Sequence, residues 1–207
     1  MNPLTAPLMP PALDLAGIAV FALSGALLAT RLRLTLVTVA FFAMVTGVGG
    51  GSVRDVLIGA PVFWVRDPWV APIVLLMALL AWFTPARWWE GKLLDWADAL
   101  GLAFYAAFGA AKALSYDVEP VPAMMMGVIT GCVGGIIRDV FAGVPSILMR
   151  PELYVTAAAL SATLCVGGIV AGLPQGAAMA GAALAGFALR GAALIWRIEL
   201  PGYARGP

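Results

Sequence analysis

The sequence predicts an all-α integral membrane protein of seven transmembrane helices, arranged as two inverted three-helix repeats and one extra helix. Three observations predict this fold: a composition too apolar for a water-soluble surface, seven apolar stretches of roughly spanning length, and an internal repeat with an offset of 84 residues. Because every connection between the stretches is short, we expect a single membrane domain over 1–207. Within it the first repeat occupies about 13–84, the second about 93–172, and the extra helix about 176–197.

The composition indicates that lipid covers most of the surface. Of the 207 residues, 62% are hydrophobic and 11% are charged, whereas ordinary soluble domains carry about 25% charged residues. The chain has no histidine, and its two cysteines stand apart in apolar runs, so they form no metal cluster, disulfide framework or imidazole-assisted nucleophile. Basic and acidic residues nearly cancel, 12 against 11, which leaves no positive field for nucleic acid. We expect no enzyme activity, no bound cofactor and no nucleic-acid partner.

Seven stretches approach the roughly 20 apolar residues that a spanning helix needs. They lie at 13–30, 34–59, 69–83, 94–114, 121–143, 153–172 and 176–196. Basic residues concentrate in the first, third and fifth connections and in the C-terminal tail, at Arg31, Arg33, Arg87, Lys92, Arg150, Arg197 and Arg205. The positive-inside rule then places the N-terminus outside and the C-terminus in the cytoplasm. We expect the membrane to be the bacterial inner membrane.

The internal repeat aligns residues 13–66 with residues 97–150 without a gap, and 18 of the 54 positions are identical. The matches include the most unusual residues of the chain, at Asp14/Asp98, Gly50/Gly134, Arg54/Arg138, Asp55/Asp139 and Pro61/Pro145. Each repeat holds three spans, so the second copy must cross the membrane in the opposite sense. Inverted repeats of this kind place a solute pathway between the two units, near the bilayer centre.

Both repeats carry a glycine-rich run, in the second and fifth predicted helices. Residues 46–55 read T-G-V-G-G-G-S-V-R-D, and residues 130–139 read T-G-C-V-G-G-I-I-R-D. Glycine lets a helix unwind, so we expect both helices to be broken at a waist, where freed carbonyls suit a dehydrated cation. The alternative is that the glycines only allow helices to pack closely. The candidate pathway residues of the two runs are Thr46, Gly47, Gly49, Gly50, Gly51, Thr130, Gly131, Gly134 and Gly135.

Each run ends in an Arg-Asp pair, which is expensive at membrane depth unless it faces a cavity or a partner. Adjacent residues on a helix do not face each other, so we expect Arg54 to pair poorly with Asp55. Our hypothesis is cross-pairing between the repeats, of Arg54 with Asp139 and of Arg138 with Asp55. Such pairs would face the pathway or merely lock the two units together, and the two roles can coexist.

Four other residues are candidates for the pathway or its mouths. Asp14 and Asp98 stand at the predicted starts of the first and fourth helices, where they either cap the helix or attract cations to a vestibule. Lys112 stands where the first repeat has Leu28, and it either snorkels outward or faces the pathway. Ser24 and the two threonines of the glycine runs supply hydroxyls that can replace the hydration shell of an ion.

The run G-G-G-S-V-R-D-V-L-I-G-A-P at 49–61, its partner G-G-I-I-R-D-V-F-A-G-V-P at 134–145, and the 3+3+1 pattern of spans resemble one family. This family is the prokaryotic trimeric intracellular cation (TRIC) channels. The resemblance implies a homotrimer in which each subunit has its own hourglass pore for potassium and sodium. It implies that the first, second, fourth and fifth helices line the pore, with the waist at the glycine runs. Lys112 is similar to a basic residue of the fourth helix that animal members link to voltage and lipid response.

We therefore expect a passive channel for monovalent cations, in which Asp55 and Asp139 bias the field toward cations. The alternative is an alternating-access carrier for a small amino acid such as glycine, because inverted repeats also build carriers and the same bacterial domain has been described as a glycine transporter. A retinal protein is excluded because the last predicted helix has no lysine for a Schiff base. A membrane-embedded enzyme is excluded because the chain lacks metal ligands and a nucleophile–base pair.

Overall fold

The computed structural model describes residues 11–89, 93–149 and 151–201, and these residues are almost entirely helical. The α-helices are α1 (Pro11–Arg31), α2 (Leu36–Leu57), α3 (Phe63–Arg66), α4 (Val70–Phe83), α5 (Leu93–Leu114), α6 (Pro120–Ala142), α7 (Val155–Val170) and α8 (Gln175–Trp196). Two 3-10 helices, η2 (Ala86–Trp89) and η3 (Ile147–Met149), follow α4 and α6. Within the described residues, an isolated β-bridge joins Glu152 to Glu199. Three basic residues used for the predicted orientation, Lys92, Arg150 and Arg205, lie outside the described residues.

Each predicted span coincides with one helix, with ends that differ by a few residues. Helices α1, α2, α5, α6 and α8 are long and apolar enough to cross a membrane. Helices α4 and α7 are apolar but have 14 and 16 residues. At the helical rise these are about 21 and 24 Å long, against a hydrocarbon core of about 30 Å. The four-residue helix α3 was not predicted.

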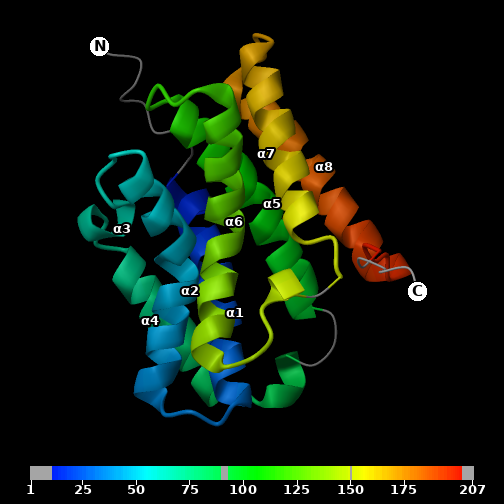
Figure 1. Ribbon diagram of the computed structural model, residues 1–207. Coiled ribbons are helices and arrows are strands. Elements are labelled where there is room, and N and C mark those ends of the chain that lie inside the picture. Colours follow the sequence, from blue (N-terminus) through cyan, green and yellow to red (C-terminus); the bar gives the residue numbers. More distant parts are fainter. Residues whose placement is uncertain (1–10, 90–92, 150, 202–207) are drawn as a thin grey trace.

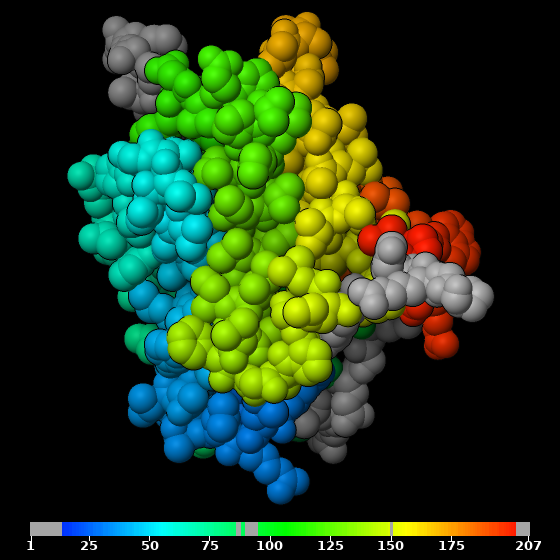
Figure 2. Space-filling model, viewed as in Figure 1, coloured from blue at the N-terminus to red at the C-terminus, as the bar shows by residue number. Residues whose placement is uncertain are grey.

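The helices of the two repeats pack in the same order (Figure 1). Helix α1 packs on α2 and α4, helix α5 packs on α6 and α7, and α2 meets α6 at the junction of the repeats. Helix α8 packs on α5 and α7, both in the second repeat. In the space-filling view, α6 lies between the α2–α3 region and α7 (Figure 2). The outer face of α4 exposes large apolar side chains, at Leu75, Leu76, Leu79, Trp82 and Phe83, as a lipid-facing helix does.

The turns of the two repeats have matching backbone conformations. Arg33 and Asp117, which are 84 residues apart, both adopt the left-handed region, with φ of 56° and 58°. Gly59 and Gly143, also 84 residues apart, have φ of 68° and 65° and follow the C-termini of α2 and α6. Glycine takes this conformation at little cost. The repeat seen in the sequence is therefore also a repeat of local structure.

The prediction that two helices are broken at glycines is wrong in this structure. Helix α2 is continuous through its glycine run, and so is α6. A Cβ on Gly50 would overlap the carbonyl oxygen of Thr130, and a Cβ on Gly134 would lie 2.5 Å from the carbonyl oxygen of Thr46. The glycines let two intact helices touch backbone to backbone. Close packing was the alternative explanation of the two runs.

Other glycines also make equivalent contacts in the two repeats. Gly25 packs on the side chain of Thr46 in the first repeat, and Gly109 packs on the side chain of Thr130 in the second. Across the junction, Gly17 packs on the ring of Tyr105, and Gly101 packs on the ring of Phe21 in the equivalent place. These exchanged contacts indicate a pseudo-two-fold relation between the repeats.

Candidate functional site

Charged side chains lie buried where the two repeats meet. Arg54 is 1% exposed, Asp55 0% and Asp139 2%. Ser24, Thr46 and Thr130 are also buried in this region. Charges at such depth must be paired or face a polar cavity, so these contacts define the candidate site.

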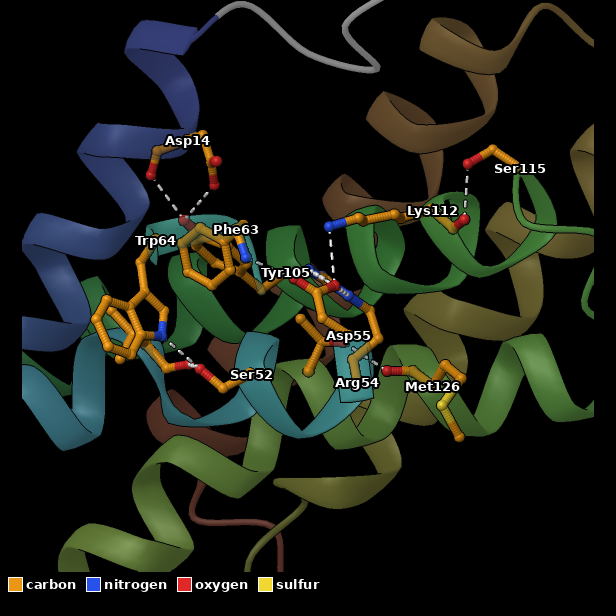
Figure 3. Close-up of polar contacts among 12 residues, drawn as sticks. Asp14, Ser52, Arg54, Asp55, Phe63, Trp64, Tyr105, Lys112, Ser115 and Met126 are labelled. Carbon is orange, nitrogen blue, oxygen red and sulfur yellow. Dashed lines mark hydrogen bonds and ion pairs between the residues drawn. The ribbon is translucent and has the colours of Figure 1, made fainter. Parts of the chain in front are cut away.

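Asp55 is the centre of the first cluster (Figure 3). Its Oδ1 accepts hydrogen bonds from Arg54 Nε at 2.9 Å, from Arg54 Nη2 at 2.7 Å and from Lys112 Nζ at 2.8 Å. Its Oδ2 accepts a hydrogen bond from the backbone N–H of Phe63 at 3.0 Å, which anchors the start of α3. Lys112 therefore turns inward to a carboxylate, and its side chain is 14% exposed.

Asp139 repeats this arrangement in the second cluster. Its Oδ1 accepts from Arg138 Nε at 2.9 Å, and the Arg138 Nη2 atom lies 2.7 Å from the same oxygen. Its Oδ2 accepts from the backbone N–H of Ile147 at 3.0 Å. The position equivalent to Lys112 holds Leu28, so this carboxylate lacks the third charged donor.

The hypothesis of cross-pairing between the repeats is wrong. Each arginine pairs with the aspartate that follows it, because its long side chain brings the guanidinium back to a carboxylate that leaves the helix in another direction. The arginines do contact the opposite repeat, but through other residues. Arg138 Nη1 donates to Ser24 Oγ at 2.6 Å, and the Arg54 guanidinium lies 5.4 Å from the ring centre of Phe108. Ser24 and Phe108 occupy equivalent positions in the repeat.

Two cavities flank the contact between α2 and α6. The first, of about 30 Å³, is lined by Asp14, Arg54, Lys112, Tyr105 and Phe108 and reaches Thr46, Thr130 and the glycines between them. The second, of about 380 Å³, is lined by Ser24, Leu28, Asp98, Arg138, Asp139 and the end of α8. We call them the Asp14 cavity and the Asp98 cavity. Their lining residues do not overlap, so packed side chains separate them.

The two predicted mouth carboxylates lie in these cavities. Asp14 is in the first turn of α1, and its Oδ1 accepts a hydrogen bond from Tyr105 Oη at 3.0 Å. Asp98 lies one turn deeper in α5, because Asp95 takes the first turn. Capping therefore does not account for Asp98, whereas both carboxylates occupy a cavity wall.

The other predicted pathway residues divide between cavity walls and helix contacts. Gly47, Gly51 and Gly131 line the Asp14 cavity with Gly50 and Gly134. Gly49 faces Gly134 across the helix contact, and Gly135 lies near Tyr154 and Arg138. The hydroxyls of Thr46 and Thr130 donate to the carbonyls of Phe42 and Met126, at 2.7 and 2.6 Å. Each hydroxyl then has only acceptor capacity left for a water molecule or a cation.

Two residues of the Asp14 cavity, Tyr105 and Phe108, were not among the predicted ones. The repeat alignment held a signal for Phe108, because it pairs this residue with Ser24. Arg190 of α8 has no counterpart in the repeat, and the sequence suggests a role in assembly for it. In the structure it donates to Glu152 at 2.6 Å and lies over the ring of Tyr154 at 5.3 Å. Its partners are within the chain and beside the Asp98 cavity. Among the described residues, no group of three His, Cys, Asp or Glu side chains is placed to hold a metal ion.

Long apolar helices, inverted repeats and paired charges beside cavities together define a multi-pass membrane protein of the channel and transporter class. A family model described as glycine transporter matches residues 11–86 and, a second time, residues 95–169. The two matches begin 84 residues apart, which is the offset of the internal repeat. The chain belongs to this family, which includes the prokaryotic TRIC channels.

Relatives of known sequence cover nearly the whole chain. A UPF0126 membrane protein of Vibrio cholerae is 39% identical over 198 residues, covering 93% of this chain and 82% of that protein. The UPF0126 inner membrane protein YadS of Escherichia coli is 38% identical over 202 residues, covering 93% and 95%. These relatives are membrane proteins and the matched structures are channels, so the chain is not an enzyme.

Solved structures of TRIC channels share the fold. The TRIC orthologue of Rhodobacter sphaeroides is 37% identical, with a TM-score of 0.82 over 90% of this chain and 97% of that one. Another TRIC cation channel is 28% identical, with a TM-score of 0.85 over 95% and 98%. A TRIC channel of Caenorhabditis elegans is 14% identical and has a TM-score of 0.64, which is a likeness of fold alone.

Proposed function

We propose that the chain is a channel for the monovalent cations potassium and sodium, with a pore through each subunit. One observation carries the proposal: paired charges and two cavities follow the junction of α2 and α6 in a chain 37% identical to a TRIC channel. The path runs from the Asp14 cavity, past Thr46 and Thr130, to the Asp98 cavity. Its walls are α1, α2, α5 and α6, and its narrowest point is the contact between the glycine runs.

The polar groups along this path suit a cation. Asp14 and Asp98 attract cations at the two mouths. At the centre, the lone pairs of the threonine hydroxyls can replace part of the hydration shell. Because the helices are intact, this role falls to hydroxyls and not to carbonyls freed by unwinding. The packed contact between the cavities represents a closed state, and conduction requires it to widen.

The membrane arrangement is part of the same proposal. All seven apolar helices cross the bacterial inner membrane as one domain over 1–207, with the repeats at about 13–84 and 93–172 and α8 as the extra helix. The N-terminus faces outward and the C-terminus faces the cytoplasm. Three chains form a homotrimer, as in the TRIC channels whose fold this chain shares.

Planar-bilayer recording on the purified protein tests the proposal. A tenfold gradient of potassium chloride should give discrete single-channel currents whose reversal potential approaches the potassium equilibrium potential. Replacing potassium with sodium should retain the currents. A protein that inserts into vesicles, as flotation measures, but passes no current under any gradient or voltage would contradict the proposal.

A second candidate function is a carrier for glycine, and the description of the matching family model favours it. A carrier and a channel differ in counterflow. In proteoliposomes loaded with unlabelled glycine, a carrier accelerates the entry of labelled glycine and saturates, whereas a channel for cations leaves glycine entry at the protein-free rate. Currents without counterflow support the channel, and counterflow without currents supports the carrier.

A further inference from the structure

A third cavity lies at the C-terminal ends of α1 and α4, which pack against each other. Its volume is about 370 Å³, which is within the range of pockets that hold small molecules. Leu27 and Ala81 are buried and form an apolar base, and the exposed Arg31 and Arg33 stand at the rim. We call it the Arg33 pocket. It shares Arg31 with the Asp98 cavity and no other described residue.

Hydrogen bonds organise the rim of this pocket. Arg31 Nη2 donates to the backbone carbonyl oxygen of Trp89 at 3.1 Å. Trp89 Nε1 in turn donates to Thr84 Oγ1 at 2.7 Å, so the turn after α4 is held against the end of α1. Neither Arg31 nor Arg33 forms an ion pair with another described residue. Both positive charges are therefore open to a ligand.

The charge around the Arg33 pocket is positive. Of the described residues that line it, none is acidic. The two connections that the Arg31–Trp89 hydrogen bond joins, 31–35 and 84–92, contain four basic residues and one acidic residue, which are Arg31, Arg33, Arg87 and Lys92 against Glu90. An anion there would meet a positive excess, whereas the arginines at the junction of the repeats are each paired with an aspartate.

The Arg33 pocket lies at the level where phospholipid head groups meet the protein. Helix α4 has 14 residues and is about 21 Å long, against a hydrocarbon core of about 30 Å. A bilayer thins beside a short helix, which brings head groups toward its end. Trp82 and Trp88, near this end, are 42% and 61% exposed, and tryptophan side chains favour the membrane–water interface.

We propose that the Arg33 pocket binds the head group of an anionic phospholipid, with the lipid phosphate held by Arg31 and Arg33. The guanidinium group presents paired N–H donors that match phosphate oxygens. The acyl chains would follow the exposed face of α4, where Leu75, Leu79 and Trp82 lie at helical spacing on one side. This site goes beyond the proposed channel, and its occupation does not depend on whether the chain conducts ions.

Native mass spectrometry of the purified full-length protein in detergent tests the site without any measurement of transport. The protein is titrated with phosphatidylglycerol or with phosphatidylcholine of the same acyl chains, and the dissociation constant of the first bound lipid is measured. The wild type should prefer phosphatidylglycerol. Arg31→Gln and Arg33→Gln should each weaken phosphatidylglycerol binding by about fivefold, since one arginine near the membrane surface contributes about that factor. Phosphatidylcholine binding should change little.

A matched control is Arg66→Gln, which makes the same exchange at an exposed arginine at the end of α3 and should retain the preference. Because Arg33 is exposed and its side chain contacts no charged partner among the described residues, Arg33→Gln should keep the melting temperature of the wild type. The proposal is overturned if both lipids bind equally well, or if Arg33→Gln and Arg66→Gln lose the same affinity. Displacement of phosphatidylglycerol by an excess of inorganic phosphate would also overturn it, because the pocket would then take a free anion.

Discussion

The Asp55 carboxylate balances two cations, Arg54 and Lys112, whereas its counterpart Asp139 balances one. Replacing either aspartate with asparagine keeps the side-chain shape and removes the charge. An asparagine also turns an NH₂ group toward a donor, whichever way its amide is oriented, because both oxygens of each carboxylate accept hydrogen bonds. Breaking a buried ion pair from one side costs about 3–5 kcal/mol, and this is our expectation for Asp139→Asn.

Asp55→Asn should cost more, because Lys112 also loses its carboxylate. A hydrogen bond to a charged group contributes about 1.5–3 kcal/mol, and the 14% exposure of the lysine side chain lowers this to about 1–2 kcal/mol. In a chain of this length 1 kcal/mol shifts the melting temperature by about 2–4 °C. Asp55→Asn should therefore melt about 2–8 °C below Asp139→Asn, when thermal unfolding of both is followed in one detergent. An equal melting temperature, or a lower one for Asp139→Asn, would refute the reasoning that Lys112 belongs to the Asp55 cluster.

Two further predictions concern the contact between α2 and α6 and the charge of Lys112. Gly50→Ala places a methyl group against the carbonyl oxygen of Thr130 and should lower the free energy of unfolding by about 1–3 kcal/mol. Gly167→Ala, at a helical glycine with open space around it, should instead be neutral or stabilising by up to about 1 kcal/mol, and similar losses in both variants would contradict the close contact. Lys112→Leu removes one of the two positive charges that share Asp55, so single-channel potassium conductance should rise by a few-fold, as expected from relief of a repulsion on the order of 1 kcal/mol. A lower conductance in this variant would contradict a repulsive role for the lysine.

The positions of the helices were predictable because they depend on properties that the sequence displays directly. Apolar stretches mark each helix, and the repeat places Arg54 and Arg138, and likewise their aspartates, in equivalent surroundings. The structure confirms the equivalence down to single hydrogen bonds, such as those from the N–H groups of Phe63 and Ile147. Composition and an internal alignment contain this information without any knowledge of contacts.

Whether α2 and α6 are unwound or intact at their glycine runs could not be predicted in the same way. Glycine permits both an unwound helix and a close contact between intact helices, and the two outcomes have the same sequence pattern. What decides between them is the backbone of the opposite helix. The carbonyl oxygens of Thr46 and Thr130 lie where a Cβ would be, and only the three-dimensional structure shows this.

The pairing of the arginines was wrong for a different reason. The prediction considered the directions in which Arg54 and Asp55 leave the helix and neglected the length of the arginine side chain, which reaches back to the neighbouring carboxylate. The role of Phe108 was missed because a phenylalanine in an apolar helix carries no signal by itself. Its importance depends on the serine in the equivalent place, and on the arginine that each of the two residues faces.

Because the two cavities differ in size, the two halves of the molecule are not equivalent. A duplicated scaffold with identical mouths would work the same way whichever way up it was inserted in the bilayer. Here one cavity is small and lined by several aromatic rings, and the other is large and bordered by α8, which has no counterpart in the first repeat. In the proposed channel, inverted insertion would exchange the cavity that each side of the membrane meets, so the direction of insertion matters to that function.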